Sequence, residues 1–173
     1  MKMSNDEVEK VTYIGIGEIA LGHNGDILRI SSLGSCIGLL IYSKNPVNGN
    51  VAVIGHIMLP TSSKTETKRE NKWGPAKYAD EAVPLMIKKL ERASVKKENM
   101  SAKIVGGANM FGHGSQTLKI GKNNEIEVRR LLSEEKIELV RSYTGGDTGM
   151  SVTYIVKNNT MTIRLTGGEI VKL

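Results

Sequence analysis

Apolar residues gather in short stretches that predict a chain made mostly of β-strands. Residues 11–21 and 27–32 form two such stretches around an Asn-Gly turn, which is typical of a hairpin, and residues 37–42 form a third. The near-continuous apolar run at 51–59 is typical of a buried strand, and Pro60 ends it. Further strands are predicted at 102–105, 137–143, 151–156, 160–165 and 169–173.

Two other stretches have a helical period. Between 78 and 92 the apolar residues recur every three or four positions, although Pro84 predicts a kink or a late helix start. A second helix is predicted over 123–132. Its apolar side would be formed by Ile126, Leu131 and Leu132.

Many strands and two helices within 173 residues predict one α/β (α+β) layered domain over 11–173. We expect a mixed, mainly antiparallel sheet with two main helices. Residues 1–10 are polar and are expected to form a flexible N-terminal tail. This tail has no apolar stretch of a secretion signal, and no window approaches the about 20 apolar residues of a membrane span, so we expect a cytoplasmic protein without membrane insertion.

Composition narrows the classes of function. A single cysteine excludes an internal disulfide and a Cys-rich zinc site, and the three histidines stand far apart, so no metal site is expected. A Gly-x-Gly pattern at 15–20 lies inside a predicted strand and does not open a helix, so it is not a dinucleotide-binding fingerprint. We expect the protein to use no cofactor. The net charge is +6, but seven aromatic residues offer little base stacking, which argues against a nucleic-acid partner.

Cys36 and His56 are the residues with the clearest chemical potential. They lie symmetrically about Pro46, in the middle of a predicted turn over 43–50. If the flanking strands pair as a hairpin about that point, Cys36 faces His56 directly, and the imidazole can take the thiol proton. The alternative is a small buried cysteine beside a hydrogen-bonded core histidine.

The residues just before the cysteine fit the catalytic alternative. Gly34 and Ser35 would present backbone N–H groups beside a nucleophile at Cys36. Such groups can bind the oxyanion of a tetrahedral intermediate.

Several stretches, in matching order, resemble the chemoreceptor glutamine deamidases, the CheD family. The two most specific are Leu-Gly-Ser-Cys-Ile-Gly at 33–38 and Gly-His-Ile-Met-Leu-Pro at 55–60. The resemblance covers roughly 13–165, nearly the whole chain. Further matching stretches lie at 14–18, 103–111, 120–123 and 145–146.

The resemblance implies an activity, a site and partners. Members of this family hydrolyse the side-chain amide of particular glutamines on methyl-accepting chemotaxis receptors, with a cysteine matched by Cys36 and a histidine matched by His56. They also bind and stimulate CheC, a phosphatase of the phosphorylated response regulator. A threonine five or six residues before the cysteine usually acts as a third, polar group. Ser31 and Ile30 stand there, so Ser31 is the candidate, with Ser32 as the alternative.

Two other functions remain open at this stage. The chain could act mainly as a non-enzymatic regulator that binds the CheC-type phosphatase. It could also be a cysteine amidase or esterase with another substrate, because amide and ester hydrolysis share an acyl-transfer route. In the deamidase interpretation, basic residues within 64–77 would meet the acidic helical bundle of a receptor.

Overall fold

The computed structural model describes residues 10–44, 49–62, 72–109 and 119–173. The expected N-terminal tail up to residue 9 and most of the basic stretch at 64–77 lie outside the described residues.

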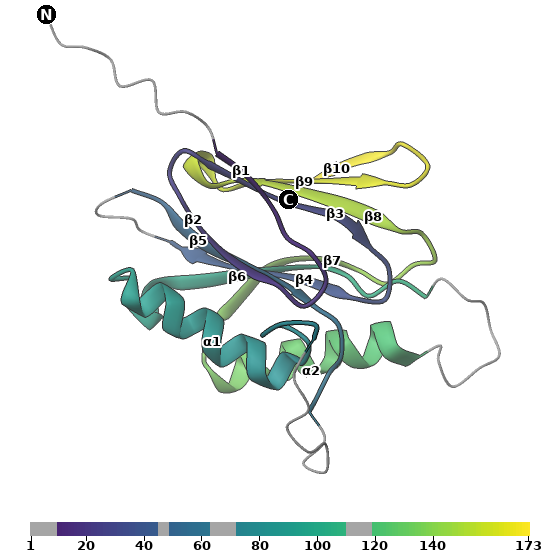
Figure 1. Cartoon of the computed structure of the whole chain (residues 1–173), viewed down its shortest axis with the longest axis horizontal. Coiled ribbons are helices and arrows are strands. Elements are labelled where there is room, and N and C mark those ends of the chain that lie inside the picture. The colour runs from purple at the N-terminus through teal and green to yellow at the C-terminus, as the bar shows by residue number, and fades with distance from the viewer. Residues whose placement is uncertain (1–9, 45–48, 63–71, 110–118) are drawn as a thin grey trace, which may run out of the picture.

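Two five-stranded sheets lie face to face, and two helices cover the far side of one of them (Figure 1). We call the sheet next to the helices the central sheet and the other the outer sheet. The central sheet has the order β2 (Ile19–His23), β5 (Val51–Ile57), β4 (Ile37–Ser43), β6 (Met100–Gly106) and β7 (Glu138–Thr144). The outer sheet has the order β1 (Lys10–Tyr13), β3 (Asp26–Leu33), β8 (Met150–Ile155), β9 (Thr160–Leu165) and β10 (Ile170–Lys172).

The α+β class is confirmed, with two sheets where one was expected. Among the described strands, β1 pairs with β3 and β6 with β7 in parallel, and the other ladders are antiparallel. The helices are α1 (Ala79–Arg92) and α2 (Ile120–Glu134), and short 3-10 turns lie at Lys97–Asn99 and Val156–Asn158. Each main helix is shorter than the about 20 residues that cross a membrane, and no described helix qualifies as a span.

Both faces of β5 are covered, which explains its near-continuous apolar sequence. Val53 and Ile57 face the helices, where they join one hydrophobic core. Ala52 and Ile54 point the other way, into a second core between the two sheets. Because side chains alternate along a strand, His56 shares the face of Ala52 and Ile54.

The start of the chain departs from the sequence prediction. The expected strand at 11–21 is divided into β1 and β2, with residues 14–18 outside any strand. The Asn-Gly turn is present, but it leads from β2 in the central sheet to β3 in the outer sheet. The two strands therefore form no hairpin ladder, because β2 pairs with β5 while β3 pairs with β1 and β8.

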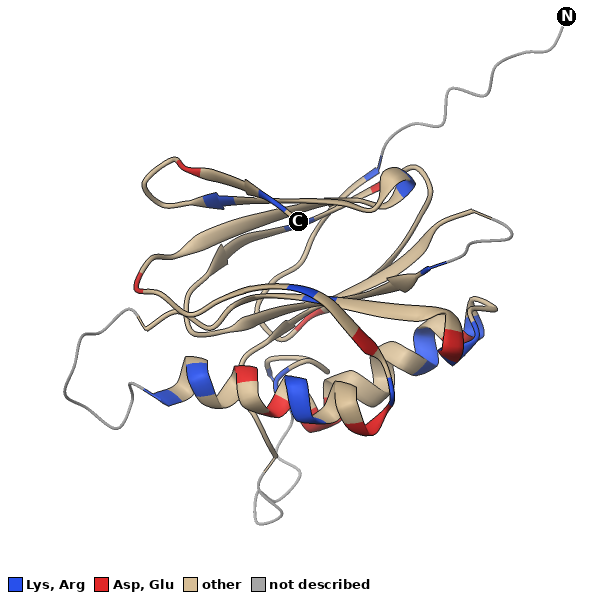
Figure 2. Cartoon of the chain, turned by 180° about the vertical axis from the view of Figure 1, so that it is seen from behind, with Lys and Arg blue, Asp and Glu red and all other residues tan. Residues whose placement is uncertain are grey.

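The helices also differ in detail. α1 begins at Ala79 with Pro84 inside it, so the late helix start is wrong; Pro84 lies on the exposed side and leaves the buried stripe intact. In α2, Ile126 is 54% exposed, so the expected apolar side is only partly correct. The charged outer faces of the helices are seen in Figure 2, and ion pairs such as Arg130 with Glu127 join residues one turn apart on α2.

Candidate active site

Cys36 lies at the end of a three-residue loop, 34–36, that joins β3 of the outer sheet to β4 of the central sheet. Its side chain is half-buried and packs against the hydrophobic core between the sheets. The thiol therefore faces the same layer as Ile54 and His56 of β5.

His56 is only 3% exposed and pairs across the ladder with Gly38, so the expected direct pairing with Cys36 is wrong. The register differs by two residues from a hairpin centred on Pro46. A two-residue shift keeps every side chain on its face, whereas a one-residue shift would reverse it. Cys36 is thus placed toward the diagonal neighbour position, and diagonal neighbours in a ladder are roughly 7–8 Å apart, within reach of long side chains.

The free protein holds both groups in their neutral forms. Burial raises the pKa of the Cys36 thiol. Burial lowers the pKa of His56, partly offset by the nearby Ile14 carbonyl and the negative charge of Glu18. The Ile14 carbonyl favours the imidazolium without reaching hydrogen-bond geometry, since neither ring nitrogen of His56 has a hydrogen-bond partner among the described residues.

The backbone of residues 14–18 is fastened along His56. The Gly17 N–H donates to the His56 carbonyl at 2.9 Å, and the His56 N–H donates to the Glu18 carbonyl at 3.0 Å. The Gly15 N–H donates to Glu18 Oε2 at 2.7 Å, which holds this carboxylate in place. Sequence reasoning missed these neighbours because the stretch was assigned to a regular strand.

Three consecutive carbonyl groups fix the loop that carries the thiol. The carbonyl oxygens of residues 34, 35 and 36 accept hydrogen bonds from the Ala108 N–H at 2.9 Å, Asn124 Nδ2 at 3.0 Å and the Gly107 N–H at 2.8 Å. Gly106, with φ +101°, makes this contact possible, because a Cβ there would collide with the Cys36 carbonyl oxygen.

The N–H groups of the same loop, unlike its carbonyl groups, are not engaged by described residues. None of the three amides at 34–36 donates a hydrogen bond to a described residue. Gly34 and Ser35 therefore have their carbonyls fixed, and their N–H groups have no acceptor in the described part of the chain, as an oxyanion site beside Cys36 requires.

Asn124 is a site neighbour that the sequence did not reveal. It is fully buried on α2 and donates from Nδ2 to the Ser35 carbonyl and to the Met58 carbonyl, each at 3.0 Å. The one available signal was its position, four residues before Val128 and seven before Leu131, in the buried stripe of α2.

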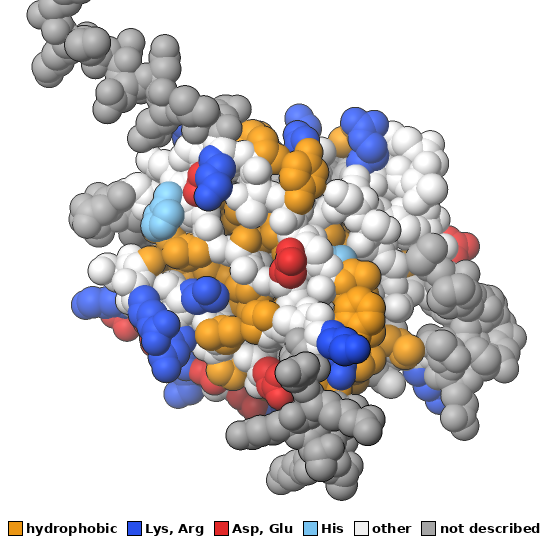
Figure 3. All heavy atoms as spheres, in the orientation of Figure 1, with side chains coloured by type: hydrophobic (Ala, Val, Ile, Leu, Met, Phe, Trp, Pro, Cys, Tyr) orange, Lys and Arg blue, Asp and Glu red, His pale blue; other side chains and the backbone are white. Residues whose placement is uncertain are grey.

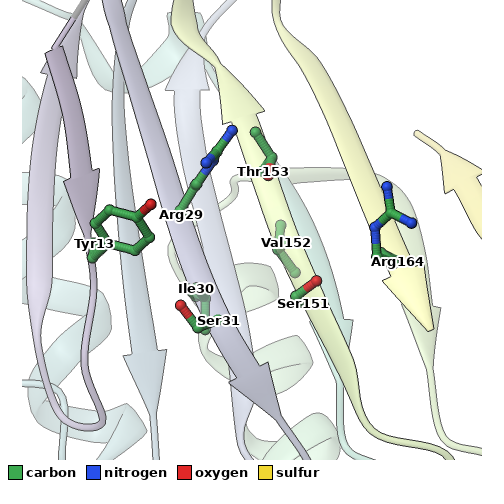
Figure 4. Close-up of a pocket in the computed structure, with 8 residues that line it drawn as sticks. All are labelled: Tyr13, Arg29, Ile30, Ser31, Ser151, Val152, Thr153 and Arg164. Atoms are coloured by element: carbon green, nitrogen blue, oxygen red, sulfur yellow. The ribbon is translucent and has the colours of Figure 1, made fainter. Parts of the chain in front are cut away.

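Ser31 and Ser32 lie elsewhere. Both are exposed, and Ser31 points into a hollow of about 430 Å³ on the outward face of the outer sheet, near Tyr13 and Arg164 (Figure 4). The structure therefore does not bring Ser31 to His56, which faces the layer between the sheets. Ile30, at the other position that the family usually fills with threonine, is buried in that layer.

Charged side chains of both signs lie on the face shown in Figure 3, where they are interspersed with hydrophobic side chains. In the described parts of the chain, no three His, Cys, Asp or Glu side chains group as metal ligands.

Comparisons with known proteins agree with the earlier resemblance. A family model described as CheD chemotactic sensory transduction matches residues 58–165. A probable chemoreceptor glutamine deamidase CheD of Clostridium botulinum is 36% identical over 99% of this chain and 100% of its own length. The chemoreceptor glutamine deamidase CheD of Thermotoga maritima is 36% identical over 90% of this chain and 92% of its own. The family model begins after His56, but the full-length relatives span both candidate residues, and the chain belongs to the CheD family.

Proposed function

We propose that this protein hydrolyses the side-chain amide of glutamine residues in a chemoreceptor, giving glutamate and ammonia, with Cys36 as nucleophile and His56 as proton carrier. The names of its relatives support the substrate. One structural observation carries the chemistry: Cys36 ends a loop with free N–H groups and faces the same layer as the unpaired imidazole of His56.

The first half of the reaction forms a thioester. His56 takes the thiol proton as Cys36 Sγ attacks the amide carbon, so the neutral pair becomes charged only during attack. The carbonyl oxygen becomes an oxyanion, which accepts hydrogen bonds from the free N–H groups of the loop at Gly34 and Ser35. The tetrahedral intermediate collapses when the C–N bond breaks, and His56 returns the proton to the leaving ammonia.

The second half restores the enzyme. His56 accepts a proton from water as the water oxygen attacks the thioester carbon. The C–S bond then breaks, the sulfur of Cys36 recovers its proton from His56, and glutamate is released.

A third group must favour the imidazolium that forms twice in this cycle. Glu18 and the Ile14 carbonyl fit this role, because both raise the pKa of His56. Ser31 does not, because its side chain points into the hollow on the outward face of the outer sheet, and Ser32 is exposed.

The test is incubation of a chemoreceptor cytoplasmic fragment with the wild type and with Cys36→Ala, followed by peptide mass spectrometry and an ammonia assay. We expect glutamine-to-glutamate conversion with the wild type alone. No conversion by a folded wild type on its own organism's receptors would overturn the proposal and favour a regulator of the CheC-type phosphatase. Conversion by Cys36→Ala would overturn the assigned nucleophile.

A further inference from the structure

We infer that Asn124 is a positioning residue that fixes the Cys36 loop relative to the strand that carries His56. This inference rests on the proposed function and extends it to a third element of the fold, helix α2. Asn124 touches neither the thiol nor the imidazole through a hydrogen bond, so it acts through the backbone that holds them.

The two hydrogen bonds of Asn124 span the site. One ends on the carbonyl of Ser35, directly before Cys36, and the other on the carbonyl of Met58, two residues after His56. Two carbonyl acceptors require the NH₂ end of the amide, so they also fix its orientation. One buried nitrogen thus joins the two chain segments that must keep register with each other during the reaction.

Close packing at the start of α2 brings Asn124 to this place. Gly121, one turn earlier, lies so near the end of β6 that an added Cβ would be 2.5 Å from the Gly107 carbonyl oxygen and 3.0 Å from that of Ala108. Gly107 and Ala108 also hold the loop from the other side, through their N–H groups. Helix, loop and strand therefore form one rigid support beneath Cys36.

The other end of the Asn124 side chain indicates that the residue is not there for stability alone. Its Oδ1 is buried without a hydrogen-bond partner among the described residues, which is unfavourable for folding. A leucine of similar size would remove this unpaired oxygen along with the two bonds. The same change leaves the Ser35 and Met58 carbonyls without this donor, so the thermal midpoint is measured beside kcat to separate loss of the clamp from loss of stability.

We expect the loss of Asn124 to slow the chemical step of the reaction. A displacement of about 1 Å between reacting groups can reduce a rate by roughly 100-fold. Without Asn124, the loop N–H groups and the thiol lose one of three carbonyl anchors, so we expect kcat to fall by that order while KM changes little.

The test compares Asn124→Leu and Asn124→Ser with Asn123→Leu and Asn123→Ser. Asn123 is the adjacent, exposed asparagine on the same turn of α2, which makes it a matched control. Each variant is assayed for kcat and KM on the receptor fragment, for thermal midpoint, and for the rate of Cys36 alkylation by iodoacetamide against pH. We expect both Asn124 variants to lower kcat, to alkylate several-fold faster because the loop is loosened, and to keep a cooperative unfolding transition.

Two results would overturn the inference. One is wild-type kcat and alkylation in a folded Asn124 variant. The other is an equal loss of kcat in the Asn123 variants. Alkylation needs no substrate, so it tests the positioning role even if the wild type proves not to deamidate the receptor.

Discussion

His56 lies opposite Gly38 across the β4–β5 ladder, so its direct cross-strand neighbour has no side chain. Cys36 lies two residues before Gly38, and its side chain packs against the same core between the sheets that His56 faces. A Cβ at Gly38 would meet Val105, Leu33 and Ile30, which belong to the core between the sheets that His56 also faces.

The first expected outcome concerns Gly38→Ala. An added Cβ would lie 3.0 Å from Val105 Cγ2 and 3.1 Å from Leu33 Cδ1, so these side chains must shift slightly. We expect a loss of about 1 kcal/mol in the free energy of unfolding and a roughly tenfold lower kcat/KM. Denaturant unfolding and steady-state kinetics on the receptor fragment measure the two effects.

Gly22→Ala is the matched control for that substitution. Its Cβ would meet Leu28 Cδ1 and Val156 Cγ2, both at 3.1 Å, in an equally crowded place on β2. We expect a similar loss of stability with unchanged activity. Equal activity in the two variants would show that the space beside His56 does not matter for the reaction.

The pH dependence of kcat/KM follows from the two displaced pKa values. The reactive form has a neutral imidazole and a protonated thiol. Burial lowers the pKa of His56 below its ordinary 6.5 and raises that of Cys36 above its ordinary 9.0. We therefore expect a broad plateau, with an acid limb below about 6.5 and an alkaline limb above about 9. A narrow bell between those values would contradict this assignment.

Glu18→Gln tests the group that favours the imidazolium. Its carboxylate raises the pKa of His56, so its removal is expected to move the acid limb to lower pH and to reduce kcat. Glu18 is exposed, so the shift should shrink with added salt.

Asp26→Asn is the control for loss of a carboxylate. Asp26 Oδ2 accepts from the His23 N–H at 2.8 Å, a bond of the same kind as that of Glu18, at the other end of the β2–β5 ladder. The acid limb of the kcat/KM profile of Asp26→Asn should match that of the wild type. An equal displacement in both variants would show that overall charge, and not Glu18, sets the pKa of His56.

Stability should also depend on His56. Because the folded-state pKa is lowered, the unfolded chain binds more protons as pH falls, and the stability present above about 6.5 is lost below it. The expected slope is at most about 1.4 kcal/mol per pH unit. His56→Gln should remove this contribution, whereas His23→Gln, at an exposed position, should keep it. Urea unfolding from about pH 7.5 to about pH 5 measures the slopes, and identical slopes in wild type and His56→Gln would rule the effect out.

Sequence patterns predicted elements well where burial and periodicity agree. The buried run over β5 and the stripe of α1 are examples, because one face or both faces of the element are apolar. The pattern failed in α2, where a buried polar residue, Asn124, occupies the stripe and an apolar one, Ile126, is exposed. Hydrophobicity alone cannot show that an asparagine is buried to bond two distant carbonyls.

The sequence supplied two candidate residues for the site, but not their relative geometry. Cys36 and His56 could be singled out from spacing and resemblance, and the structure places both toward the layer between the sheets. The register of the two strands could not be predicted, because the pairing that is symmetric about Pro46 is one of several that keep both residues on the same face. The clamp on the loop and the approach of Glu18 join segments far apart in sequence, which no local pattern encodes.

The most direct test of the central claim is to trap the acyl-enzyme. The protein is mixed with a chemoreceptor cytoplasmic fragment, quenched in acid during turnover, digested and mapped by mass spectrometry. We expect a thioester between a receptor glutamine side chain and Cys36, together with glutamate at that receptor site, and neither product with Cys36→Ala. Glutamate formation by Cys36→Ala, or turnover during which the Cys36 thiol never carries an adduct, would contradict the account.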